Sequence, residues 1–332
     1  MVSNEPIVQT RKITKHFPVF QTGIVRRTLI GFIKAVDQVS IDIKRGEIFG
    51  LVGESGCGKT TFGRVLLNLI PPTSGEVLFD GVNIYDIESR ERELWFRRQA
   101  QLIFQDPYLS LNPRMTVSEI VGEPYVIHQR GKSKQERHEQ VIKLLQLCGL
   151  EDYHALRYAH EFSGGQRQRI GIARALAVEP QLIIADEPVS ALDVAVQAQI
   201  LNLLKDIKDK FNLTIVFIAH DLSVVRHISN RIAVMYLGQI VELAPADDFI
   251  VAPLHPYTQA LISAIPIPDP TLERKRIILR GDVASPLNPP AACRFNTRCI
   301  YAQRKCTEVE PELRELRPGH FVACHFPLDE VT

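Results

Sequence analysis

The segment GESGCGKTT, residues 53–61, has the residue types and spacing that bind the phosphates of a nucleotide. The arrangement Gly53-x4-Gly58-Lys59-Thr60 is a complete P-loop, in which glycines let backbone N–H groups surround a β-phosphate. Lys59 would neutralise the β- and γ-phosphates, and the Thr60 hydroxyl would bind Mg²⁺. The alternative is an ordinary glycine-rich turn. The residues expected to bind the nucleotide here are Gly53, Ser55, Gly56, Gly58, Lys59, Thr60 and Thr61.

Two acids follow an apolar run in LIIADEP, residues 182–188. Asp186 is expected to bind Mg²⁺ through water, and Glu187 to polarise the water that attacks the γ-phosphate. Without a P-loop, the same pair would be a strand end capped by surface acids.

Two further polar residues end apolar runs: Gln105 in QLIFQ and His220 in IVFIAH. Parallel strands bring their carboxyl ends to one edge of a sheet, so both side chains are expected beside the P-loop. Gln105 would be a neutral ligand for Mg²⁺ or water, and His220 would hydrogen-bond the γ-phosphate. A lone histidine at a strand end is otherwise more often structural.

A second anion-binding signature occurs in EFSGGQRQR, residues 161–169. Adjacent glycines after a serine expose backbone N–H groups at the start of a basic helix. One chain therefore carries two signatures for phosphate.

The elements that must position these residues can be predicted from periodicity. Alternation predicts strands at 7–14 and 35–43, joined by a surface hairpin or loop, and a buried strand leads into the P-loop. A helix is expected at about 59–70 and helical structure from about 107 to 178. Further strands are expected at 101–105, 181–186, 213–220 and 231–237. Strands alternating with helices indicate an α/β fold with a mostly parallel sheet.

The bulk properties limit the function. The 332 residues are 45% hydrophobic with a net charge of +1, which does not favour a globally basic nucleic-acid binder. The N-terminus has no apolar signal-peptide core, and no apolar run is long enough for a bilayer, so a cytosolic protein is expected.

The composition shifts towards proline and cysteine beyond residue 250. We expect an ATPase domain at 1–250 and a C-terminal extension at 251–332. The extension spaces its cysteines as Cys293-x5-Cys299-x6-Cys306-x17-Cys324. In a reducing compartment such a cluster indicates a metal more than disulfides, and the absence of a C-x-x-C knuckle favours a structural [4Fe–4S] cluster over Zn²⁺.

The order of these motifs, with SALD at 190–193, resembles the nucleotide-binding subunit of an ABC transporter over about residues 7–245. Phe162 departs from the leucine that usually precedes SGGQ. The resemblance implies a P-loop NTPase of ABC type, with an antiparallel β subdomain, a helical subdomain at about 107–178, and ATP hydrolysis. It also implies that Phe17 in ITKHF stacks on adenine.

In that family two ATPase domains pair head to tail, and the SGGQ of one closes over the ATP held by the other. Ser163, Gly164, Gly165 and Gln166 would then serve the partner's nucleotide, and Asp193 would lie at the dimer seam. Contacts to the membrane subunit are expected from Tyr108, Leu109, Leu111 and Met115, with ordinary packing as the alternative.

The tail segments LHPYTQAL, SPLNPP and CRFNTRC, with the insert containing GIVRRT, resemble oligopeptide/dipeptide importer ATPases. This implies a peripheral protein on the cytoplasmic face of the membrane that powers peptide import. Its partners would be two transmembrane permeases, an extracytoplasmic solute-binding protein and a second homologous ATPase, favoured as a heterodimer, without nucleic acid. Alternatives are nickel, glutathione or sugar import, a soluble ABC ATPase acting on nucleic acid, or an iron–sulfur redox protein that binds ATP.

Overall fold

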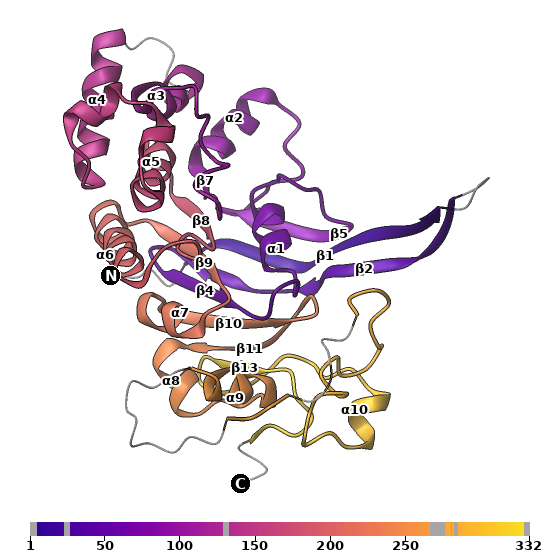
Figure 1. The fold of residues 1–332 in the computed structure, drawn as a ribbon. Helices are drawn as coiled ribbons and strands as arrows, with labels where there is room; N and C mark the ends of the chain where they lie inside the picture. Colours follow the sequence, from indigo (N-terminus) through magenta and orange to yellow (C-terminus); the bar gives the residue numbers. More distant parts are fainter. Residues whose placement is uncertain are drawn as a thin grey trace, which may run out of the picture. The chain divides into compact units, whose positions relative to one another are not determined.

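The computed structural model describes residues 5–22, 27–128, 133–265, 276–279, 281 and 285–328. The chain divides into two compact units, which are described separately. Unit 1 comprises residues 1–7, 44–47 and 86–218, and unit 2 comprises residues 8–43, 48–85 and 219–332. Figure 1 shows the elements of both units in chain order.

Three parallel strands form the sheet of unit 1: β7 (Ala100–Ile103), β8 (Leu182–Asp186) and β9 (Thr214–Ala219). Every residue of β8 and β9 is buried, as expected for strands that are covered on both faces. Continuous apolar runs rather than alternation therefore marked these strands in the sequence, and their predicted positions are confirmed within one or two residues.

Helices make up most of the rest of unit 1. They are α2 (Arg90–Gln99), α3 (Val117–His128), α4 (Lys134–Leu147), the 3₁₀ turns η1 (Asp152–Leu156) and η2 (Ala159–Glu161), α5 (Gly164–Leu176) and α6 (Val194–Phe211). Helices α3, α4 and α5 pack on one another, which confirms helical structure in the predicted region. Helix α2 was not predicted, because the segment is strongly charged and Phe96 is its buried residue.

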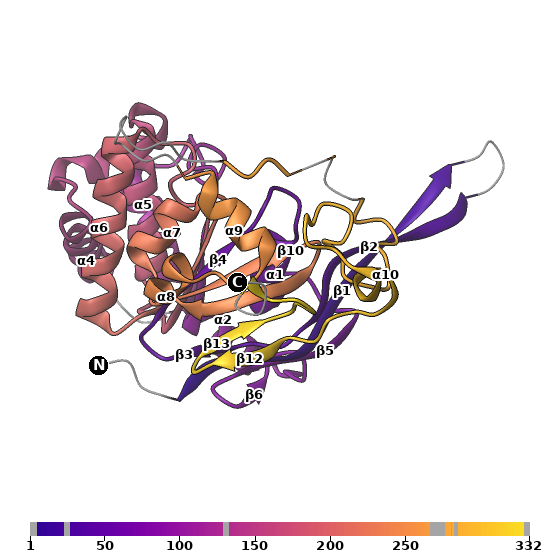
Figure 2. The same cartoon turned by 90° about the horizontal axis from the view of Figure 1, so that it is seen from below.

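Unit 2 contains a mixed sheet. Strand β4 (Ile48–Val52) pairs in parallel with β10 (Arg231–Tyr236), which pairs antiparallel with β11 (Gln239–Pro245). From the tail, β13 (His320–Val322) pairs with β11, and β12 (Arg314–Arg317) pairs with β13, both antiparallel (Figure 2). The sheet of this unit therefore contains both parallel and antiparallel pairs. Its antiparallel part is formed by β11, β13 and β12, strands beyond residue 238 that were not predicted.

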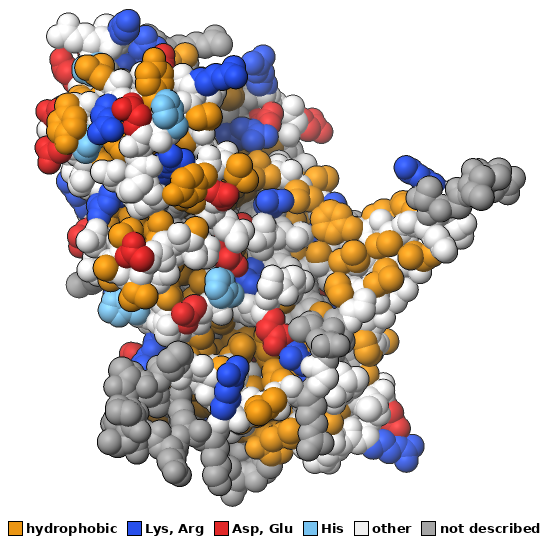
Figure 3. All heavy atoms as spheres, viewed as in Figure 1, with side chains coloured by type: hydrophobic (Ala, Val, Ile, Leu, Met, Phe, Trp, Pro, Cys, Tyr) orange, Lys and Arg blue, Asp and Glu red, His pale blue; other side chains and the backbone are white. Residues whose placement is uncertain are grey.

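The second sheet of unit 2 has the order β2–β1–β5–β6, and β3 (Asp42–Lys44) also pairs with β1. The strands are β1 (Pro6–Thr22), β2 (Arg27–Val39), β5 (Ser74–Phe79) and β6 (Val82–Asn83). Strands β1 and β2 form the predicted surface hairpin, a long arm with hydrophobic side chains on the face seen in Figure 3. Residues 23–26 of the GIVRRT segment lie outside the described residues.

The helices of unit 2 are α1 (Lys59–Leu66), α7 (Leu222–Ile228), α8 (Ala246–Val251), α9 (Pro256–Ser263) and α10 (Arg304–Glu308). Helix α1 ends four residues before the predicted position. The predicted domain boundary near residue 250 stays a prediction. Among the helices that the structure describes, none combines the length and apolar character that crossing a bilayer requires.

Candidate functional site

The P-loop follows β4, and its glycines are required by close backbone contacts. Gly58 precedes α1 with φ at 111°, and a Cβ atom there would lie 1.9 Å from the Ala35 carbonyl oxygen. A Cβ atom on Gly53 would lie 2.2 Å from the Met235 carbonyl oxygen. No real Cβ atom approaches so closely, so the loop can wrap tightly only with glycine at both positions.

Lys59 is held inside this loop. Its side chain is 5% exposed, and Nζ donates to the Gly53 carbonyl at 2.8 Å and to the Glu54 carbonyl at 3.1 Å. The ammonium group is therefore fixed at the centre of the cradle, where the loop N–H groups can bind a phosphate.

Cys57 also lies in the loop and is buried. Burial raises the pKa of its thiol, an effect only partly offset by the Lys59 ammonium. A neutral thiol fits the interpretation of Cys57 as a small filler of the loop.

Tyr257 and Arg298, from the C-terminal part of the chain, contact the P-loop and were not predicted from the sequence. The Glu54 N–H donates to the Tyr257 hydroxyl at 3.0 Å, and Arg298 forms an ion pair with the Glu54 carboxylate at 2.8 Å. Glu54 occupies a variable position of the motif, so no sequence signal pointed to this contact.

The catalytic candidates of unit 1 meet at the end of β8. Gln105 Nε2 donates to Glu187 Oε2 at 2.9 Å, while Asp186 is the buried last residue of the strand. Glu187 has a φ of 46°, in the left-handed region that non-glycine residues rarely adopt. The strand thus ends abruptly and turns the Glu187 carboxylate towards Gln105.

The SGGQ motif caps helix α5. Ser163 Oγ accepts from the Gln166 N–H at 3.4 Å, and Gln166 Oε1 accepts from the Ser163 N–H at 3.1 Å, which is a capping box. A Cβ atom on Gly165 would lie 2.5 Å from Val196 Cγ1 of α6. Gly165 therefore allows α5 and α6 to pack closely, a role in addition to its predicted approach to a phosphate.

Asp193, the last residue of SALD, begins helix α6. Its carboxylate accepts from the Val196 N–H at 2.9 Å, so the residue is the N-cap of that helix. The structure thereby fixes the orientation of its side chain.

His220 and Phe17 lie in unit 2. His220 directly follows β9 and is exposed, and its neighbour Asp221 caps α7. Phe17 lies half-buried in β1, with Lys15 Nζ at 5.1 Å from its ring centroid. Its accessible ring is compatible with stacking on a base.

The predicted contacts to a membrane subunit differ in exposure. Leu109 is 86% and Tyr108 is 54% exposed, whereas Leu111 is 4% exposed. Met115 is intermediate. Burial of Leu111 favours ordinary packing for that residue.

The four tail cysteines line one small pocket of about 10 Å³, together with His255 and Phe295. Burial, with a contribution from Cys293, Cys299 and Cys306, raises the pKa of the Cys324 thiol to about 12. None of these cysteines forms a disulfide. Within the described part of the chain, no group of three or more His, Cys, Asp or Glu side chains is arranged to hold a metal ion.

Comparison with known proteins identifies the family. Residues 36–190 match the family described as "ABC transporter", and residues 241–306 match "Oligopeptide/dipeptide transporter, C-terminal region". The oligopeptide transport ATP-binding protein AppF of Bacillus subtilis (strain 168) is 50% identical over 97% of this chain and 98% of its own length. The oligopeptide transport ATP-binding protein OppF of the same strain is 52% identical over 96% of each chain.

Solved structures agree. The ATP-binding cassette MJ0796, in a dimeric post-hydrolysis state with ADP and Pi, has a TM-score of 0.63 at 32% identity, over 72% of this chain and 98% of that chain. The cbiO1 subunit of Clostridium perfringens also has a TM-score of 0.63, at 25% identity, over 75% of this chain and 92% of its own.

Fold and motifs define an ABC ATPase, an enzyme that hydrolyses ATP with Mg²⁺. The chain belongs to the ABC transporter family and, within it, to the oligopeptide/dipeptide transporter ATP-binding proteins.

Proposed function

We propose that this chain is the ATP-hydrolysing subunit that powers import of di- and oligopeptides through a membrane ABC transporter. The observation that carries the proposal is identity of 50% or more to oligopeptide transport ATP-binding proteins along nearly the whole chain. The match includes the C-terminal region, which is separate from the ATPase motifs.

Lys59 and the backbone of residues 53–61 hold the phosphates in this proposal, while Thr60 and Asp186 serve Mg²⁺. Glu187 polarises the attacking water. Because Gln105 donates its amide hydrogen to Glu187, its carbonyl oxygen can face Mg²⁺ or water. His220 hydrogen-bonds the γ-phosphate, and Phe17 stacks on the adenine.

Two ATPase subunits pair head to tail, so that Ser163, Gly164, Gly165 and Gln166 act on the nucleotide of the neighbour. The capping geometry supports this assignment: Ser163 Oγ accepts from a backbone N–H, so its own proton can be donated to a phosphate oxygen. The N-terminus of α5 adds a favourable field for an anion. Asp193 lies at the seam, and we favour a heterodimer.

The remaining partners are two membrane permeases and an extracytoplasmic solute-binding protein, with the chain peripheral on the cytoplasmic face of the membrane. Exposed Tyr108 and Leu109 support a contact with the permeases. Nickel, glutathione and sugar importers use similar subunits, so the solute is part of the test.

The cysteine-rich C-terminal extension is proposed to hold a [4Fe–4S] cluster, with Zn²⁺ as the alternative, through Cys293, Cys299, Cys306 and Cys324. Four thiols in one pocket supply the donor set for such a cluster. The small pocket means that the thiolates must rearrange around it. A bound cluster would supply structural cross-linking to a segment with little regular structure.

Uptake by the reconstituted transporter tests the function. Vesicles containing this chain, its permeases and partner ATPase, supplied with the solute-binding protein, should accumulate a labelled di- or oligopeptide with ATP, and should not do so with Lys59→Ala. Competition by nickel, glutathione or sugar, without competition by peptides, would contradict the proposed solute.

A further inference from the structure

Glu54 places a carboxylate in the phosphate-binding loop, directly after Gly53. The triphosphate of ATP is strongly negative, so an uncompensated carboxylate at this position would oppose binding. The residue also lies beside the P-loop lysine, because the Glu54 carbonyl accepts from Lys59 Nζ at 3.1 Å.

Arg298 compensates this charge through a bidentate ion pair with the Glu54 carboxylate. Its Nη1 lies 2.8 Å from Glu54 Oε2, and its Nη2 lies 3.2 Å from Oε1. The Arg298 side chain is 8% exposed, compared with 26% for Glu54. A guanidinium stays protonated in proteins, so Arg298 keeps its charge, and its two contacts with Glu54 fix it against the loop.

The backbone of Glu54 is also held by a residue from the C-terminal part of the chain. Its N–H donates to the hydroxyl of Tyr257, the second residue of α9. Phe295 packs against Tyr257 and Tyr236, with ring centroids 5.4 and 5.3 Å apart. One aromatic cluster thus orients Tyr257, while Arg298 lies three residues beyond Phe295 in the same segment.

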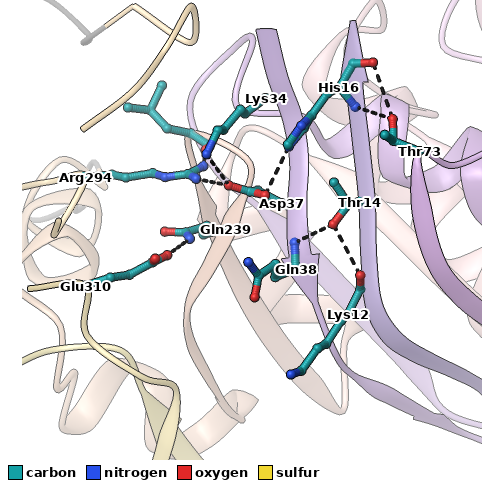
Figure 4. Close-up of polar contacts among 11 residues, drawn as sticks. Lys12, Thr14, His16, Lys34, Asp37, Gln38, Thr73, Gln239, Arg294 and Glu310 are labelled. Carbon is teal, nitrogen blue, oxygen red and sulfur yellow. Dashed lines mark hydrogen bonds and ion pairs between the residues drawn. The ribbon is translucent and has the colours of Figure 1, made fainter. Parts of the chain in front are cut away.

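Arg294 supplies a second connection between the tail and the P-loop. Its guanidinium contacts the Asp37 carboxylate and the Leu237 carbonyl, and Asp37 also contacts Lys34 (Figure 4). The adjacent Gly238 N–H donates to the Cys57 carbonyl of the P-loop at 2.8 Å. The turn after β10 is therefore held between the tail and the loop.

We propose that Arg298 is a positioning residue for ATP binding: it neutralises Glu54 and, with Tyr257, fixes the start of the P-loop, so that the C-terminal segment sets nucleotide affinity. This inference rests on the ATPase activity of the family and is independent of the transported solute.

The dissociation constant for MgATP, measured on the purified full-length chain by titration calorimetry, tests the inference. Arg298→Gln should weaken binding about tenfold, because it leaves the Glu54 carboxylate unpaired. Glu54→Gln should leave affinity at or above the wild-type value. The double variant should recover most of the loss, since the repelling charge is gone. The control is Arg304→Gln, which removes an exposed pair with Glu308 in the same tail and should leave affinity unchanged.

A double variant as weak as Arg298→Gln would overturn the inference, because it would show that the arginine acts through packing and not through the charge of Glu54. Wild-type affinity in Arg298→Gln would overturn it as well.

If circular dichroism shows that Arg298→Gln does not fold, Arg298→Lys takes its place, measured alone and combined with Glu54→Gln. Lysine keeps the charge and loses the two-pronged geometry, so a loss of affinity below threefold is expected, and a loss as large as tenfold would contradict charge neutralisation. If ATP binding is normal but peptides are not taken up, the proposed solute is contradicted and the role of Arg298 is not.

Discussion

Gln105 Nε2 and Glu187 Oε2 are 2.9 Å apart, although the residues are separated by 82 positions in the sequence. The hydrogen bond fixes the carboxylate at the end of β8. The relationship therefore connects the two residues that the sequence assigned to the same chemical step.

Glu187→Gln should abolish hydrolysis while preserving ATP binding. The amide removes the base but keeps the size of the side chain, so a loss of kcat of about 10²- to 10⁴-fold is expected. Phosphate release measures the loss of hydrolysis, and titration with MgATP measures whether binding is preserved. Glu139→Gln, an exposed residue of α4, is the control and should hydrolyse normally. Intact turnover in Glu187→Gln would show that the catalytic assignment is wrong.

Ser163→Ala and Ser133→Ala form a matched pair, since both serines cap a helix with a complete capping box. Each substitution should lower the free energy of unfolding by about 1 kcal/mol. Only Ser163→Ala should also reduce ATP hydrolysis, because Ser133 has no proposed role at a nucleotide. Denaturant unfolding and ATPase assays of the assembled transporter separate the effects. Equal hydrolysis by both variants would contradict a role of Ser163 in the neighbour's site.

Gly58→Ala should be far more damaging than Gly81→Ala. Both glycines have positive φ, 111° and 77°, so both alanines are strained by about 1 kcal/mol. A Cβ atom at Gly81 meets open space, whereas one at Gly58 lies 1.9 Å from a backbone oxygen. Thermal unfolding and MgATP binding should therefore be nearly normal for Gly81→Ala. For Gly58→Ala the melting temperature should fall and binding should be lost. Similar losses in the two variants would contradict the backbone contact.

His255 makes stability dependent on pH. Burial lowers its pKa to about 4 from the usual 6.5, and its Nδ1 accepts from the Tyr257 N–H at 3.0 Å. Between these values the unfolded chain binds the extra proton and the folded chain does not. Stability is thus complete above pH 6.5 and falls towards pH 4, by up to about 3 kcal/mol.

Urea unfolding at pH 7 and pH 4.5 measures this dependence. His255→Asn keeps an acceptor for the Tyr257 N–H and does not titrate, so its loss of stability on acidification should be smaller than that of the wild type. An unchanged pH dependence in this variant would assign the effect to other groups.

A cluster in the tail has a direct spectroscopic signature. Protein purified without oxygen should absorb broadly in the visible range and contain iron and acid-labile sulfide. Cys306→Ser should lose both, while Cys148→Ala, a buried cysteine distant in sequence, should retain both. Colourless protein containing zinc would select the alternative metal, and absence of any metal would contradict the site.

The sequence was a good guide where one local segment carries the whole signal. The glycine-rich turn between β4 and α1, the buried strands β8 and β9, and the start of helix α5 after Ser163 each depend on neighbours in the chain. Helix α2 and strand β12 lack such a signal, because almost none of their residues are buried, and β13 has only three residues, too few for a recognisable period.

By itself the sequence determined the ATPase class and predicted which residues bind the phosphates. A P-loop needs glycine for its tight backbone turn, lysine for the phosphate charge and threonine for Mg²⁺, all at a fixed spacing. Only the tertiary structure decided what holds that loop. Arg298 meets Glu54 across 244 residues of sequence, and β13 joins the sheet beside β11. Neither contact follows a periodic pattern, since each arises where separate segments converge and a buried charge or strand edge requires a partner.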